Sequence, residues 1–111
     1  MRWIKRLYVG EHAEQKKERI LRGIREGRVQ LDVYVLQLSM RSHHLEIISS
    51  LMLLQSWYKN NEEYIVVGVA KGQEEARLLL LQIVRDAIKR LGEPDLYRYL
   101  SLRMEEEGVD D

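Results

Sequence analysis

The sequence predicts a small layered α/β domain in which the order β-α-β-α-β-α gives a three-stranded, mostly parallel sheet flanked by helices, with a short C-terminal element after it. Two observations lead to this fold class. Residues 64–70, YIVVGVA, are apolar on both alternating faces, so this strand needs a layer of structure on each side. Stretches with helical spacing separate it from two other strand-like runs, and such lengths suit parallel strands joined by crossover helices.

The composition limits both the size and the chemistry of the protein. Its 111 residues suit one domain, which we place at residues 1–103, followed by an acidic tail at 104–111 that we expect to be disordered. Eighteen Lys and Arg residues balance eighteen Asp and Glu residues, so no net charge draws the chain to nucleic acid or to an anionic membrane. The absence of cysteine excludes disulfides and thiolate metal sites. With no signal-like start and no apolar window of about 20 residues, we expect a cytoplasmic protein without a membrane partner.

Two further runs are predicted as strands. Residues 3–10 combine apolar side chains with Lys5 and Arg6, which suits a strand at or near an edge of the sheet. Residues 29–38, VQLDVYVLQL, carry apolar side chains on both faces and therefore suit a strand that is covered on both sides. Enough chain lies between successive strands for a crossover helix, which predicts parallel pairing.

Three helices are predicted between and after these strands. Residues 13–26 place apolar side chains at helical spacing and basic side chains elsewhere, and Gly27 is suited to end the helix in a left-handed conformation. Residues 43–60 show a similar spacing, with a broad apolar arc. A third helix begins after the third strand and ends before Gly92. Residues 95–103 suit either a short helix or a fourth strand, and we favour the helix.

Polar and charged residues follow each predicted strand, and parallel strands would bring them to one rim of the sheet. Arginine and lysine side chains there suit a small anion or the phosphate of a nucleotide, and histidines suit acid–base chemistry near neutral pH. The acidic residues that begin the helices compete with an anion for the helix termini, so the interpretation we favour for these residues is a set of ordinary solvated loops. The candidate ligand-binding residues are His12, Ser39, Arg41, His43, His44 and Lys71.

Two other kinds of site are not expected. Adjacent residues such as His43 and His44 point in different directions on a helix or strand, so we predict no metal site and no cofactor. The basic side chains of residues 13–26 are interleaved with Glu14 and Glu18, and no aromatic stacking platform accompanies them. This pattern is typical of a solvated helix face, so we expect no nucleic acid partner.

The predicted helices have more apolar surface than one sheet face can bury, which indicates an interface. We expect a homo-oligomer, in the form of a dimer, because cyclic dimers are the commonest oligomers. The alternative is that residues 96–102 fold back over the same surface within one chain. The candidate interface residues are Leu53, Trp57, Leu78, Leu81 and Ile88.

No motif in the sequence identifies a reaction. The interpretation we favour is therefore a small intracellular homodimeric or partner-binding module without catalytic activity. The alternative is an anion-binding, nucleotide-binding or enzymatic domain that uses the His, Arg and Lys side chains at the carboxyl ends of the strands.

Overall fold

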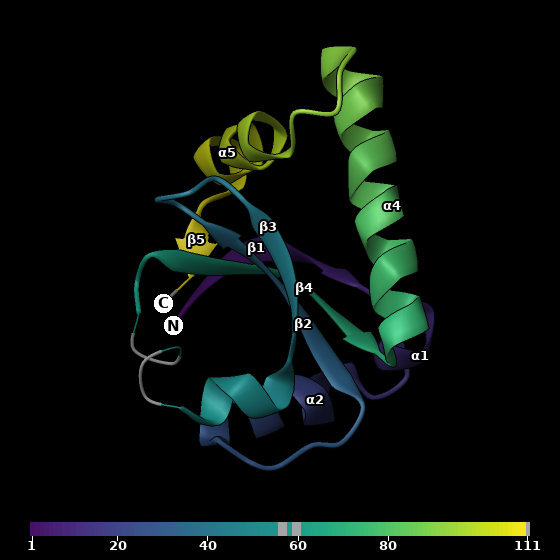
Figure 1. Ribbon diagram of the computed structural model, residues 1–111, viewed down its shortest axis with the longest axis vertical. Coiled ribbons are helices and arrows are strands. Elements are labelled where there is room, and N and C mark those ends of the chain that lie inside the picture. The colour runs from purple at the N-terminus through teal and green to yellow at the C-terminus, as the bar shows by residue number, and fades with distance from the viewer. Residues whose placement is uncertain (56–57, 59–60, 111) are drawn as a thin grey trace.

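The computed structural model describes residues 1–55, 58 and 61–110 and shows a twisted sheet with helices on both of its faces (Figure 1). None of the described helices is long and apolar enough to cross a membrane. In chain order the elements are β1 (Arg2–Val9), α1 (Glu11–Glu14), α2 (Lys17–Glu26), β2 (Val33–Ser39), β3 (Leu45–Ser49), the 3-10 helix η1 (Ser50–Leu54), β4 (Tyr64–Lys71), α4 (Gln73–Leu91), α5 (Leu96–Glu107) and β5 (Val109–Asp110).

The described strands form one sheet in the order β3-β2-β4-β1-β5. β1 runs parallel to β4, with Trp3 beside Val66 and Val9 beside Val69. The other neighbouring pairs of described strands, β2 with β4, β2 with β3 and β1 with β5, are antiparallel. The expected mixed α/β class is therefore confirmed, whereas the expected three-stranded, mostly parallel sheet is wrong.

The difference begins at residues 43–60, which we predicted as a crossover helix. Their described part contains the strand β3 and the 3-10 helix η1 instead. A tight turn follows β2, in which the Ser39 hydroxyl accepts hydrogen bonds from the backbone N–H groups of Arg41 and Ser42, and His43 adopts a positive φ of 68°. The chain therefore returns beside β2 as a hairpin, and β4 pairs with the other side of β2 in the opposite direction.

The two helical layers bury alternate side chains of the central strands. Leu36 and Leu38 of β2 face the layer built by α4 and α5, while Val33 and Val35 face the layer that contains α2. This alternation follows from the opposite directions of successive side chains in a strand. It also explains why β4 is apolar on both faces, because its residues 65–70 are all buried.

The C-terminal segment is more ordered than the sequence indicated. Residues 95–103 belong to α5, apart from the N-cap Asp95, whose carboxylate accepts a hydrogen bond from the N–H of Arg98. The helix continues beyond them, and Val109–Asp110 then pairs with β1 as a short strand. The structure thus differs from the disordered tail expected at 104–111, because pairing along the edge of β1 gives the last described residues backbone partners.

Candidate functional site

The strand directions divide the six predicted ligand-binding residues between the two ends of the sheet. Because β2 is antiparallel to β4, Ser39 at the end of β2 pairs with Tyr64 at the start of β4. Lys71 ends β4 and lies at the other end of the sheet, together with His12, which follows the parallel strand β1. The six residues therefore do not form one rim. The first group consists of Ser39, Arg41, His43 and His44, and the second of His12 and Lys71.

The group at the end of β2 has a structural explanation in the turn itself. Ser39 is buried, and its hydroxyl stabilises the turn. The ring of His43 stacks on the ring of Tyr97 from α5, with 3.6 Å between the centroids and an angle of 15° between the planes. Arg41 lies 3.6 Å from a carboxylate oxygen of Glu63 in an ion pair. These contacts hold the turn against neighbouring segments. His43 and His44 also line one cavity of about 500 Å³ together with residues 94–97, whereas Ser39 and Arg41 are not part of its lining.

His12 and Lys71 follow β1 and β4 at the point where the chain leaves these two strands toward opposite faces of the sheet. After β1 the chain enters α1 and α2 on one side of the sheet, and after β4 it enters α4 on the other side (Figure 1). Adjacent parallel strands whose helices leave to opposite sides open a crevice between them, and open α/β sheets bind ligands there. A cavity of about 440 Å³ lies at this point, lined in part by Gly10, His12, Lys71 and Leu78.

A buried carboxylate, that of Glu75, occupies the crevice. Its oxygens accept hydrogen bonds from the backbone N–H groups of His12, Ala13 (3.3 Å) and Lys71 (2.5 Å). The His12 ring nitrogen Nδ1 lies 3.0 Å from the same carboxylate. Burial opposes the charge, but the three N–H donors and His12 outweigh it and hold the pKa of Glu75 below its ordinary 4.5. The carboxylate thus takes the place that a bound anion would take at the start of α1.

The chemistry available in this crevice is limited. A carboxylate that holds an imidazole is the arrangement of a general base and its orienting group. However, the His12 side chain is 69% exposed, and none of the described residues that line the cavity is a serine, threonine or cysteine. Three lining carboxylates face two basic side chains, which disfavours an anionic ligand. Among the described residues, no group of three or more His, Asp or Glu side chains is placed to hold a metal ion. We therefore interpret Glu75, a residue of α4, as a structural residue whose hydrogen bonds link α4 to α1 and to the end of β4.

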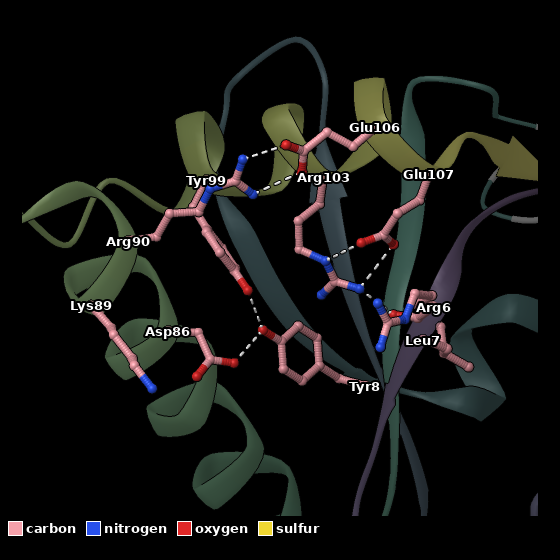
Figure 2. A pocket seen from close by; sticks show the side chains of 10 residues that line it. All are labelled: Arg6, Leu7, Tyr8, Asp86, Lys89, Arg90, Tyr99, Arg103, Glu106 and Glu107. Carbon is pink, nitrogen blue, oxygen red and sulfur yellow. Dashed lines mark hydrogen bonds and ion pairs between the residues drawn. The ribbon is translucent and has the colours of Figure 1, made fainter.

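A wider cavity of about 750 Å³ lies between β1, α4 and α5 and contains a polar network (Figure 2). The Tyr8 hydroxyl donates a hydrogen bond to the Asp86 carboxylate (2.6 Å) and lies 2.8 Å from the Tyr99 hydroxyl. The Arg103 guanidinium lies over the Tyr8 ring, 4.9 Å from its centroid, and donates to the backbone carbonyl of Arg6 (2.6 Å). Residues from three elements thus meet at one phenol.

The polar groups of this network satisfy one another. Burial raises the pKa of Tyr8, and its hydrogen bonds to Asp86 and Tyr99 raise it further, so the phenol stays neutral in the physiological range. We interpret the network as a set of structural side-chain contacts that hold α5 against β1 and α4. Sequence reasoning missed it because the bonded residues are 78 and 91 positions apart. Two arginines of the lining are also paired, Arg90 with Glu106 and Arg103 with Glu107.

The predicted interface residues lie in different environments. Leu53 is 4% exposed and packs in the core on the α2 side of the sheet, and Trp57 lies outside the described residues. On α4, by contrast, Leu78, Leu81 and Ile88 are 57%, 49% and 45% exposed. Their spacing puts them on one side of the helix, opposite the side that packs on the sheet.

Comparison of the chain with protein-family models, with curated proteins and with solved structures finds no match.

Proposed function

We propose that the protein is a binding module without catalytic activity that pairs with a second copy of itself through the outer side of α4. The observation that carries this proposal is the stripe formed by Leu78, Leu81 and Ile88, each of which is about half exposed. Contiguous apolar surface of this kind is typical of sites that contact another protein. The inner side of the same helix, which includes Ile83 and Ala87, is already fully buried on the sheet, so the outer stripe is not needed to form the core.

The spacing of the stripe suits an antiparallel pair of helices. At about 1.5 Å per residue, Leu78 and Ile88 lie roughly 15 Å apart along the helix axis. A two-fold axis between them would place Leu78 against the partner subunit's Ile88. Leu81 would then lie against the aliphatic part of the partner subunit's Arg85, whose charged end reaches solvent. Because such an interface uses the same surface on both copies, one stripe is enough to form it.

The size of the stripe predicts a weak association. Burying the exposed half of a leucine or isoleucine side chain contributes about 1 to 1.5 kcal/mol, so six such side chains contribute about 6 to 9 kcal/mol. Association itself costs at least about 4 kcal/mol in lost translational and rotational freedom. The difference of about 2 to 5 kcal/mol corresponds to a dissociation constant between roughly a few tenths of a millimolar and a few tens of millimolar. We therefore expect the oligomeric state to depend on concentration.

The charges around the stripe are mainly basic. Arg85 lies within it and Lys89 beside it, while Glu74 is paired with Arg77 at 3.7 Å. Two copies of the chain would repel each other through the basic groups, so added salt is expected to strengthen the dimer by screening that repulsion. A different protein with an acidic helix would be attracted by the same groups, and added salt would weaken that complex. The sign of the salt dependence therefore separates the two kinds of partner.

Sedimentation equilibrium over a series of concentrations up to the millimolar range tests the proposal. The wild-type chain is expected to shift from monomer to dimer, whereas Leu81→Glu, which places a carboxylate from each copy in the interface, is expected to remain monomeric. Leu31→Glu is the matched control, because Leu31 is 73% exposed in the loop before β2 and lies outside α4. A wild-type chain that stays monomeric throughout, or a dimer that Leu81→Glu leaves intact, would contradict the proposal.

A further inference from the structure

A cavity of about 370 Å³ opens beside α2 at the carboxyl end of β4, and Lys71 lines both this cavity and the crevice that holds Glu75. It is lined by residues of α2 and the residue before that helix, by the loop between α2 and β2, by the first residue of β2 and by the last residue of β4. Ile20 and Val33, which are 3% and 2% exposed, provide an apolar floor. The volume lies within the range of small-molecule sites, about 300 to 1,000 Å³.

Within the part of the chain that the structure describes, the charged residues that line this cavity are all basic. They are Lys16, Arg19, Arg28 and Lys71. The chain as a whole carries equal numbers of acidic and basic side chains, so four cations without a lining carboxylate are a local excess of positive charge. Such a cluster attracts anions, and the low-dielectric walls of a cavity strengthen the attraction.

Three of these four cations, Lys16, Arg19 and Arg28, have no strong partner among the described residues. Within the described part of the chain, neither Lys16 nor Arg19 forms an ion pair or a side-chain hydrogen bond. Arg28 has the carboxylate of Glu26 as a partner at 3.0 Å, in a pair whose side chains are 65% and 40% exposed. Exposed pairs of this kind contribute little free energy, so a stronger anion can replace Glu26 as the partner of Arg28.

The loop that closes the cavity is held in place before any ligand binds. Gln30 donates a side-chain hydrogen bond to the carbonyl of Ile20 (3.1 Å), and its side chain lies over Gly23, where a β-carbon would overlap it. The Lys71 ammonium donates to the carbonyl of Leu31 (3.2 Å) and so ties the loop to β4. A site whose loop is already ordered loses less conformational entropy on binding.

We propose that this cavity binds the phosphate group of a small phosphorylated molecule. A phosphate monoester carries close to two negative charges at neutral pH, which matches four cations whose described cavity lining contains no carboxylate. Arginine binds two phosphate oxygens at once, and lysine supplies a compact charge. The apolar floor and the side chains of Val29 and Leu31 provide contacts for an organic group beside the phosphate.

Isothermal titration calorimetry with adenosine monophosphate as the probe, and with inorganic phosphate and adenosine for comparison, tests the proposal. Adenosine monophosphate is expected to bind more tightly than inorganic phosphate, and adenosine is expected not to bind measurably. Arg19→Gln is expected to weaken the binding of adenosine monophosphate about tenfold, and the double variant Arg19→Gln/Lys71→Gln about a hundredfold. Arg22→Gln is the matched control, because Arg22 is exposed on the same helix and does not line this cavity.

Three results would overturn the proposal. The first is the absence of binding by both adenosine monophosphate and inorganic phosphate. The second is an equal loss of affinity in Arg22→Gln and Arg19→Gln, because the general charge of α2 would then explain the binding. The third is tight binding of a single-stranded RNA that Arg19→Gln and Arg22→Gln weaken to the same extent, because the cations would then form an open nucleic-acid surface. Arg19 and Arg22 are both exposed, so both variants are expected to fold, and thermal unfolding without ligand checks this.

Discussion

Replacing Glu75 by glutamine is expected to lower the free energy of unfolding by about 3 kcal/mol, although the side chain keeps its size. Glu75 is 8% exposed, and its two oxygens accept hydrogen bonds from the backbone N–H groups of His12, Ala13 and Lys71. Glutamine retains one acceptor oxygen and replaces the other by an NH₂ group, which is a donor. At least one backbone N–H group is then left without an acceptor and faces another donor.

The magnitude follows from the number of bonds that change. Leaving one buried donor unpaired costs about 1 to 3 kcal/mol. The hydrogen bonds that glutamine keeps are neutral and roughly half as strong as those to a carboxylate, which costs about a further 1 kcal/mol. His12 also loses its ionic partner, but it is 69% exposed, so that loss contributes little. The total is a large part of the stability of a small domain.

Urea unfolding followed by circular dichroism measures this loss, with Glu74→Gln as the matched control. The Glu74 side chain is 81% exposed, so the control is expected to change the free energy of unfolding by about 0.5 kcal/mol or less. The pH dependence gives a second signature. Because the folded pKa of Glu75 lies below its ordinary 4.5, its stabilisation is fully present above pH 4.5 and is lost as the pH falls through the folded pKa. The difference in stability between wild type and Glu75→Gln is therefore expected to narrow in acid.

A Glu75→Gln variant as stable as Glu74→Gln at neutral pH would contradict this prediction, because the three N–H groups would then find other partners without cost. A stability difference that stays constant into strong acid would refute the electrostatic part. The charge of the carboxylate would in that case make no contribution to the fold.

Two further variants test neighbouring contacts. Tyr8→Phe is expected to cost about 1 to 3 kcal/mol in urea unfolding at neutral pH, because Asp86 and Tyr99 lose their hydrogen-bond partner. The pKa of Tyr8 in the folded protein is raised from 10.0, so the stabilisation by the Tyr8 hydroxyl is present below pH 10 and is lost as the pH rises above 10. The wild-type chain is therefore expected to lose more stability in alkali than Tyr8→Phe. Equal losses in the two chains would contradict this expectation. Gly10→Ala is expected to cost about 1 to 3 kcal/mol, because its β-carbon would overlap the Glu75 side chain. A double-mutant cycle with Glu75→Ala is expected to show a smaller cost in that background, and an equal cost would argue against the contact.

Some features of the fold were predictable because single residues specify them. Gly27 and Gly92 end α2 and α4 with φ angles of 70° and 81°, in the left-handed region that glycine enters at little cost. The buried strand β4 was predictable from its apolar residues on both faces, since such a strand needs cover on each side. In these places local chemistry and tertiary structure agree.

In residues 43–60 the apolar pattern fits two structures. Leu45 and Ile47 alternate as in a strand, while Ile47, Ile48 and Leu51 fall on one arc of a helix. Over so few residues the periodicity does not distinguish them, and pairing with β2 decides in favour of the strand. Because the expected crossover helix is a hairpin, β2 runs opposite to β4, and the predicted rim of ligand-binding residues is divided.

The class of the fold, the positions of its buried strands and the apolar stripe on the outer side of α4 could be predicted from the sequence, because local spacing and side-chain chemistry specify them. Three other features depend on contacts between distant parts of the folded chain. They are the directions of the strands, the place of Glu75 between α1 and the end of β4, and the position of Lys71 and Arg19 along one cavity beside α2. Strand direction depends on backbone hydrogen bonds that almost every residue can form, and contacts between distant residues leave no local pattern. Neither is therefore encoded at a single position in the chain.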